Sequence, residues 1–151
     1  MQKISTCLWF DGQAAEAAEF YTSTFDDSSL GESMKGPDGN VLTVDFTLEG
    51  TQFLALNGGP AFTFNEAVSL VVNCNNQEEV DRYWNALLEG GEESQCGWLK
   101  DKYGLSWQIV PTAMPRLLNG PDPAGSQRAM EAMLKMRKLD INVLQKAYDG
   151  D

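Results

Sequence analysis

Two kinds of apolar spacing alternate along the first part of the chain. Residues 4–10 form a short run of aromatic and branched side chains, which is typical of a buried strand. In residues 13–24, alanines and aromatic residues recur three and four positions apart, which predicts one apolar face of a helix. Strands are predicted at 28–35, 41–48 and 52–57, the second with strict alternation. The predicted order is strand, helix and three strands.

The second part of the chain shows a similar order. Residues 67–72 read as a strand, and Asn76 is a suitable N-cap for a helix that ends at Gly90 and Gly91. Further strands are predicted at 95–100 and 105–110. The acidic segment between the helix and these strands, residues 89–93, is interpreted as a solvated turn.

An internal repeat follows from this order. Phe20 and Tyr21 precede Tyr83 and Trp84 by 63 residues, and the same offset superimposes the two first strands. Repetition of a βαβββ unit constrains the whole fold. We therefore predict an α+β protein with one domain over residues 1–111. Its two repeats are predicted at about 1–59 and 66–111.

Residues 112–151 have a different pattern and are predicted to form a C-terminal helical extension. A helix is expected over 126–138, and Asp140 is placed to cap a last helix over 141–148. The apolar residues of the first of these helices, which include several methionines, cover more than one face. Methionine-rich faces serve both core filling and adaptable interfaces. This apolar face could pack on the chain's own domain or form an interface with a second chain, and the sequence leaves both alternatives open.

Charge and composition narrow the choice of partners. The chain has 151 residues, 22 acidic against 11 basic side chains, and a net charge of −11. Such a surface repels phosphate backbones and anionic lipid, so we expect no nucleic acid and no membrane partner. The chain has no histidine. A Ser-His-Asp triad, a Cys-His pair and a histidine metal site are therefore excluded.

The cysteines and the N-terminus favour a cytoplasmic protein. Cys7, Cys74 and Cys96 are odd in number and have no CxxC spacing, which predicts free thiols in a reducing compartment. The N-terminal apolar run is too short for a signal peptide, and Asp11 closes it. Most free cysteines are small buried hydrophobes. For Cys96 we retain the alternative hypothesis that its thiol lines a pocket.

Several segments are similar to those of a known family. These segments are Leu8–Gly12, Glu16–Tyr21, Phe53–Gly59, Gln77–Asp81, Cys96–Asp101, Tyr103–Pro111 and Lys138–Ile141. They resemble the PhnB-like group, often labelled 3-demethylubiquinone-9 3-methyltransferase, in the glyoxalase/bleomycin-resistance (vicinal oxygen chelate) superfamily. The resemblance covers nearly the whole chain. It implies two paired βαβββ modules that form a curled mixed sheet around a pocket, and it implies a homodimer.

The methyltransferase label conflicts with the residues. An S-adenosylmethionine enzyme of the usual kind has a glycine-rich loop after the first strand of a parallel, doubly wound sheet. Here the first strand is followed by Asp11-Gly12-Gln13, which contains one glycine. We therefore do not expect this activity.

The resemblance also implies where a metal would bind. Metal-dependent members of the superfamily carry one ligand on the first strand and one on the last strand of each module. Transferred by position, these ligands fall on Thr6, Leu54, Ser69 and Gln108. None of these side chains is a carboxylate, imidazole or thiolate, which divalent ions prefer. A register shift of one residue would add Cys7 without completing a ligand set, so we expect neither a metal nor another cofactor.

A pocket without a metal is the remaining prediction. Strand alternation puts Leu8 and Phe10 on the face of Thr6. A hairpin with Gly104 as its left-handed residue puts Trp98 opposite Gln108 and leaves Trp107 on the core side. The predicted pocket residues are Thr6, Leu8, Phe10, Leu54, Ser69, Cys96, Trp98, Lys100 and Gln108. Core packing of the tryptophans, backbone partners for Ser69 and Gln108, and solvation of Lys100 are the alternatives.

Besides methyl transfer, which the family label suggests and the residues disfavour, three functions remain open at this point. The leading hypothesis is a metal-free small-molecule-binding protein with an unknown ligand and unknown catalytic residues, either a sequestering protein or a degenerate enzyme. A metal-dependent lyase, isomerase or dioxygenase of the glyoxalase type is the alternative. The third is a structural dimer module whose pocket is filled by its own side chains.

Overall fold

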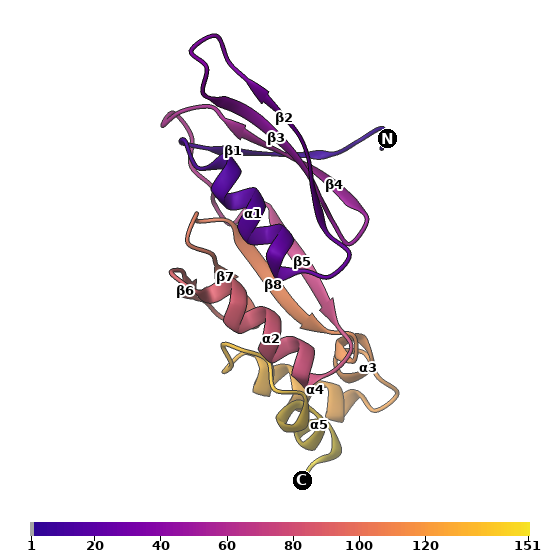
Figure 1. The fold of residues 1–151 in the computed structure, drawn as a ribbon. Coiled ribbons are helices and arrows are strands. Elements are labelled where there is room, and N and C mark those ends of the chain that lie inside the picture. The colour runs from indigo at the N-terminus through magenta and orange to yellow at the C-terminus, as the bar shows by residue number, and fades with distance from the viewer. Residues whose placement is uncertain (1) are drawn as a thin grey trace. The chain divides into compact units, whose positions relative to one another are not determined.

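A computed structural model describes residues 2–151, which divide into two compact units (Figure 1). The first unit ends at Phe64, and the second extends from Asn65 to Asp151. Each unit contains its own four-stranded mixed sheet. The helices after residue 111 belong to the second unit, so the predicted extension is grouped with the second repeat.

The first unit has the predicted order of elements. These are β1 (Thr6–Phe10), α1 (Ala14–Thr24), β2 (Ser29–Lys35), β3 (Val41–Leu48) and β4 (Thr51–Asn57). The strand order in the sheet is β1-β4-β3-β2, with β1 parallel to β4 and the other pairs antiparallel. The predicted βαβββ module is therefore confirmed here.

The core of the first unit lies between α1 and one face of this sheet. Ala14, Ala17, Ala18 and Tyr21, which the helical spacing placed on one face, are completely buried. The Tyr21 ring stacks on Phe46 of β3, with 6.1 Å between ring centroids. Small alanines on the helix allow it to approach the sheet closely enough for this contact.

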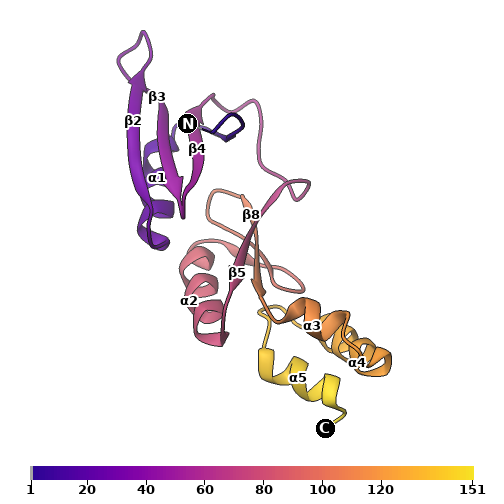
Figure 2. The ribbon, with the colours of Figure 1, turned by 90° about the vertical axis from the view of Figure 1, so that its right-hand side faces the viewer.

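The second unit repeats the order of elements on a smaller scale. It contains β5 (Ser69–Cys74), α2 (Gln77–Leu88), β6 (Glu92–Glu93), β7 (Trp98–Lys100) and β8 (Ser106–Pro111). The strand order is β5-β8-β7-β6, with β5 parallel to β8, and Figure 2 shows α2 beside β5 and β8. The Asn76 side chain accepts a hydrogen bond from the Glu79 N–H at 2.9 Å, so the predicted N-cap is confirmed.

The short strand β6 corrects one prediction. Residues 89–93 were expected to form a solvated turn, but Glu92 and Glu93 pair with Lys100 and Leu99 of β7. Acidic residues have a low strand propensity, and here the pairing with a neighbouring strand outweighs it. The second strand of the second repeat, which the sequence prediction lacked, therefore comes from this acidic segment.

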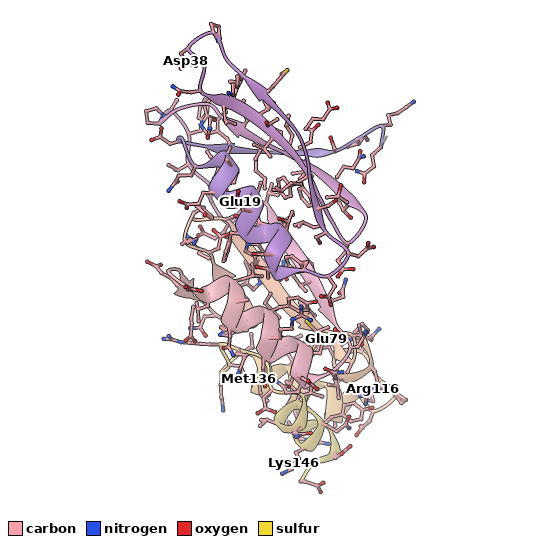
Figure 3. The ribbon with its side chains drawn as sticks, viewed as in Figure 1. Glu19, Asp38, Glu79, Arg116, Met136 and Lys146 are labelled. Carbon is pink, nitrogen blue, oxygen red and sulfur yellow. The ribbon has the colours of Figure 1, made fainter. Side chains whose placement is uncertain are left out.

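Three helices follow β8: α3 (Met114–Leu118), α4 (Pro123–Met133) and α5 (Ile141–Asp149). The predicted cap is confirmed, because the Asp140 carboxylate accepts from the Val143 N–H at 3.2 Å. The helix predicted over 126–138 ends earlier, at Met133. The reason is non-local: the carbonyls of Met136 (labelled in Figure 3) and Arg137 accept hydrogen bonds from Cys96 and Gly97 at 2.8 and 2.7 Å.

The C-terminal helices are tightly joined to α2. The Gln77 amide donates to the Leu139 carbonyl at 3.0 Å and accepts from the Ile141 N–H at 2.8 Å. Leu139 is buried with residues of the three helices in a second core cluster. Of the methionine-rich face, Met133 packs on this cluster whereas Met130 and Leu134 remain exposed. No helix in the described residues is long and apolar enough to cross a membrane.

Candidate functional site

The face of the second sheet that points away from α2, called here the distal face, carries the polar groups that the sequence predicted. Side chains alternate between the two faces of a strand. Leu99, Trp107 and Ile109 point towards α2 and are buried. Their neighbours Trp98 and Gln108 therefore lie on the distal face.

Four of the predicted pocket residues meet on this face. Trp98 is paired with Gln108, and Lys100 is paired with Ser106 in the next register position. The Gln108 amide donates a hydrogen bond to the Ser69 hydroxyl at 2.9 Å. The predicted hairpin register is confirmed, and it brings an indole ring next to two polar groups of fixed direction.

Asp101 fixes this register, although sequence reasoning did not select it. Its carboxylate accepts hydrogen bonds from the Tyr103 and Leu105 N–H groups at 2.9 and 3.1 Å. A third hydrogen bond comes from the Trp107 indole at 2.9 Å. Gly104, with a φ of 87°, supplies the left-handed residue of the turn. An aspartate at the first position of a turn is the signal that could have identified it.

A small cavity of about 190 Å³ lies beside these residues. Trp98, Lys100 and Ser106 line it together with Glu66 and Glu92. The Lys100 ammonium forms an ion pair with Glu66 at 2.7 Å. The hydrogen bond and the opposite charge raise the pKa of Lys100 and lower the pKa of Glu66. The cavity thus already holds one ammonium group.

Cys96 does not continue the strand that contains Trp98. Its backbone is left-handed, with a φ of 57°, and β7 begins two residues later. Its N–H donates to Met136, and its side chain is half-buried. The strand alternation that predicted Cys96 on the face of Trp98 begins only at Trp98, so it does not apply to Cys96.

The predicted pocket residues of the first unit are divided between the two faces of its sheet. Leu8 and Phe10 are 4% and 3% exposed and lie in the core under α1, and Thr6 shares their face. Leu54 lies on the opposite face, where its register partner is Cys7. The structure therefore does not bring Thr6, Leu8 and Phe10 together with Leu54. Alternation defines two faces, but the packing of α1 selects the buried one.

The same register corrects the alignment of the two repeats. Cys7 is paired with Leu54 in the first sheet as Val71 is paired with Gln108 in the second. The offset between the two first strands is thus 64 residues rather than 63. With this offset Cys7 corresponds to Val71, and the residue equivalent to Ser69 is Ser5.

Trp9 is a residue of the first unit that sequence reasoning missed. It alternates with Leu8, so it lies on the face away from α1. Its indole N–H donates to the Gly59 carbonyl at 2.9 Å, and its ring meets Phe62 edge-on at 4.9 Å. A Cβ at Gly58 would lie 2.5 Å from this ring, so the backbone there needs glycine.

The residues at the implied metal positions do not fit a divalent ion. Leu54 is apolar, and the Gln108 amide is already hydrogen-bonded to Ser69. An alignment shifted by one residue, with Cys7 in place of Thr6, adds one thiol to this set of side chains. Among residues 2–151 no group of three or more His, Cys, Asp or Glu side chains could hold a metal. Transition metals bind weakly to hydroxyl and amide groups alone.

Two successive βαβββ modules, each with a mixed sheet and a covering helix, define the glyoxalase/vicinal oxygen chelate class of folds. A family model described as 3-demethylubiquinone-9 3-methyltransferase matches residues 2–110. The chain belongs to this PhnB-like family. The helices that follow β8 lie beyond the matched residues.

Solved structures agree with this assignment. The PhnB protein from Bacillus cereus, which carries the same family label, is 36% identical, with a TM-score of 0.69 over 74% of this chain and 100% of that chain. A protein from Pseudomonas aeruginosa is 19% identical, with a TM-score of 0.61 over 74% and 98% of the two chains. The fosfomycin resistance protein FosX from Listeria monocytogenes, solved with Mn(II), is 14% identical, with a TM-score of 0.56 over 78% and 99%. The last two show similarity of fold alone. No curated protein matches the chain.

Proposed function

We propose that this protein binds a small organic molecule on the distal face of the second sheet, without a metal. The hydrogen bond between Gln108 and Ser69 beside Trp98 carries this proposal. Small-molecule sites combine apolar or aromatic surface with a few polar groups of defined direction. The side-chain amide oxygen of Gln108 and the hydroxyl hydrogen of Ser69 are available to a ligand that lies against the indole ring of Trp98.

A metal-dependent reaction of the glyoxalase type receives less support. FosX shares the fold and was solved with Mn(II), but its 14% identity transfers no ligand set. The implied positions in this chain offer an apolar side chain, hydroxyl groups and an amide. Methyl transfer is also disfavoured, because both sheets are mixed and neither is a doubly wound parallel sheet with a glycine-rich first turn.

A chelator is expected to leave the melting temperature unchanged. A resident metal stabilises the folded state by binding it selectively, so its removal lowers the melting temperature. The measurement is thermal unfolding of untagged protein with and without EDTA, combined with elemental analysis. A drop of several degrees, or a stoichiometric divalent ion, would contradict the metal-free proposal.

Native mass spectrometry of untagged protein tests small-molecule binding directly. We expect an additional mass on the wild-type chain, released on denaturation, and its loss in Gln108→Ala. Gln127→Ala is the matched control, because Gln127 bonds only Glu131 on the exposed side of α4 in the described structure. An unmodified wild-type mass, or equal retention in both variants, would argue against the site.

The protein is further proposed to form a homodimer. Met130 of α4 and Leu134, which follows that helix, are 38% and 58% exposed, and Val71 is 51% exposed on the edge strand β5. Exposed apolar side chains and an unpaired strand edge both favour association. We expect sedimentation at micromolar concentration to give a species of about twice 16.6 kDa. A single species of the monomer mass would remove the dimer.

A cytoplasmic location belongs to the same proposal. All three cysteines are free thiols, and burial raises the pKa of Cys74 to about 11. A buried, protonated thiol reacts slowly, and free thiols are typical of reducing compartments. The free cysteines support this location.

A further inference from the structure

The cavity beside Trp98 has more carboxylates than cations. Glu66, Glu92 and Glu93 line it against the single ammonium of Lys100. Lys100 is bound to Glu66 at 2.7 Å, whereas Glu92 makes no hydrogen bond or ion pair in the described structure. The register places Glu92 directly opposite Lys100, so its side chain lies on the distal face. The Glu92 and Glu93 carboxylates are therefore left without a direct ionic contact.

A buried hydroxyl in the same cavity also lacks a partner. Ser106 is 1% exposed, and its Oγ has no hydrogen-bond partner among the described residues. It is paired with Lys100 of β7 and Ser69 of β5, so its side chain points to the distal face and not towards α2. Leaving a buried hydroxyl unpaired destabilises the folded state. A ligand with a hydrogen-bond donor would remove that destabilisation.

These groups select the charge of a ligand. The Glu92 carboxylate, whose charge acts on Lys100 without a direct contact, attracts a cation. The Ser106 oxygen can accept a hydrogen bond from that cation, and an indole ring attracts cations through its face. The cavity is smaller than the roughly 300–1,000 Å³ of sites for drug-sized ligands. An anion would instead have to displace Glu66 from Lys100 while facing Glu92.

We propose that the cavity lined by Glu92, Trp98 and Ser106 binds the ammonium group of a small organic amine. This inference rests on the proposed function and assigns the ligand class of the same site. The ammonium is held by the Glu92 carboxylate and donates to Ser106 Oγ. Its carbon chain lies along the indole of Trp98 towards Gln108.

The test compares three probes of equal chain length by NMR of the full chain: butylammonium, butanol and butyrate. The readout is the Trp98 indole N–H signal, assigned with Trp98→Phe. We expect a saturable shift with butylammonium alone. Glu92→Gln should weaken its binding by about threefold to fivefold, as the loss of an exposed ion pair does. Ser106→Ala should weaken it by about twofold to tenfold.

Glu78→Gln is the matched control. It removes the same charge from the first turn of α2, and Glu78 does not line the cavity. We expect it to leave butylammonium binding nearly unchanged. Equal weakening by the two glutamate variants would overturn the proposal, because the effect would then come from net charge alone.

The other outcomes separate this inference from the proposed function. Binding of butanol or butyrate at Trp98 in preference to butylammonium would overturn the amine assignment and leave a small-molecule site in place. No shift at Trp98 with any probe would also overturn the amine assignment. The proposed function itself fails if native mass spectrometry shows no bound molecule, or equal retention of one in Gln108→Ala and Gln127→Ala.

Discussion

Replacing Trp107 with alanine is expected to lower the free energy of unfolding by about 3–5 kcal/mol. Trp107 is 2% exposed in β8, so the substitution leaves a large cavity between the sheet and α2. It also removes the indole N–H that donates to Asp101 at 2.9 Å. Because Asp101 organises the turn between β7 and β8, the register of the proposed site should loosen as well. Urea unfolding followed by circular dichroism measures the loss.

Trp98→Ala is the control for this substitution. Trp98 is half-buried on the distal face, so its removal should cost clearly less stability and should mainly reduce ligand binding. Trp107→Phe separates the two contributions, because it retains most of the volume and loses only the N–H. If Trp98→Ala destabilised the protein as much as Trp107→Ala, the distinction between core and site would be wrong.

Gly91→Ala is the second substitution with a large expected effect. A Cβ at Gly91 would lie 2.0 Å from the Lys100 carbonyl oxygen and within 3.0 Å of two backbone atoms of Asp101. Backbone atoms cannot rotate away as a side chain can, so the segment after α2 must move off β7. We expect the free energy of unfolding to fall by about 3 kcal/mol or more, at the upper end of overpacking effects. Pairing of Glu92 with Lys100 should be lost, which hydrogen exchange of the β6 amides would detect.

Gly104→Ala provides the comparison. Gly104 has a φ of 87°, and a Cβ added there would meet no atom within 4 Å, so only the left-handed backbone is penalised. That penalty is about 1–2 kcal/mol. Equal losses in the two variants would show that the close approach at Gly91 relaxes freely.

The confirmed parts of the site depend on local sequence. The turn from Asp101 to Gly104 fixes how β7 and β8 pair, and a two-strand register requires nothing beyond the turn and the alternation of side chains. The distal position of Trp98 and the buried position of Trp107 follow from it. The caps at Asn76 and Asp140 are equally local, since each side chain bonds a backbone group three residues ahead.

The parts that sequence reasoning missed depend on distant contacts. Residues 134–138 have a helical pattern. The carbonyls of Met136 and Arg137 nevertheless accept hydrogen bonds from the backbone of the Cys96–Gly97 segment. The acidic segment at Glu92 becomes a strand only because β7 lies beside it. Cys96 lies far from Met136 in sequence, so no short window contains that signal. Lys100 is close to Glu92 in sequence, but the low strand propensity of glutamate conceals their pairing.

The sequence by itself therefore determined the order of elements in the first repeat, most of that order in the second, and the hairpin that orients Trp98 and Gln108. Tertiary structure alone decided which face of β1 is buried. Thr6 lies on the face that α1 covers and Cys7 on the opposite face, and only the packing of α1 on the sheet distinguishes these two faces. It also placed Ser106 in a cavity with Glu66 and Glu92. Local periodicity determines which side chains share a face, whereas long-range packing determines whether that face is covered by a helix, lines a cavity or remains exposed.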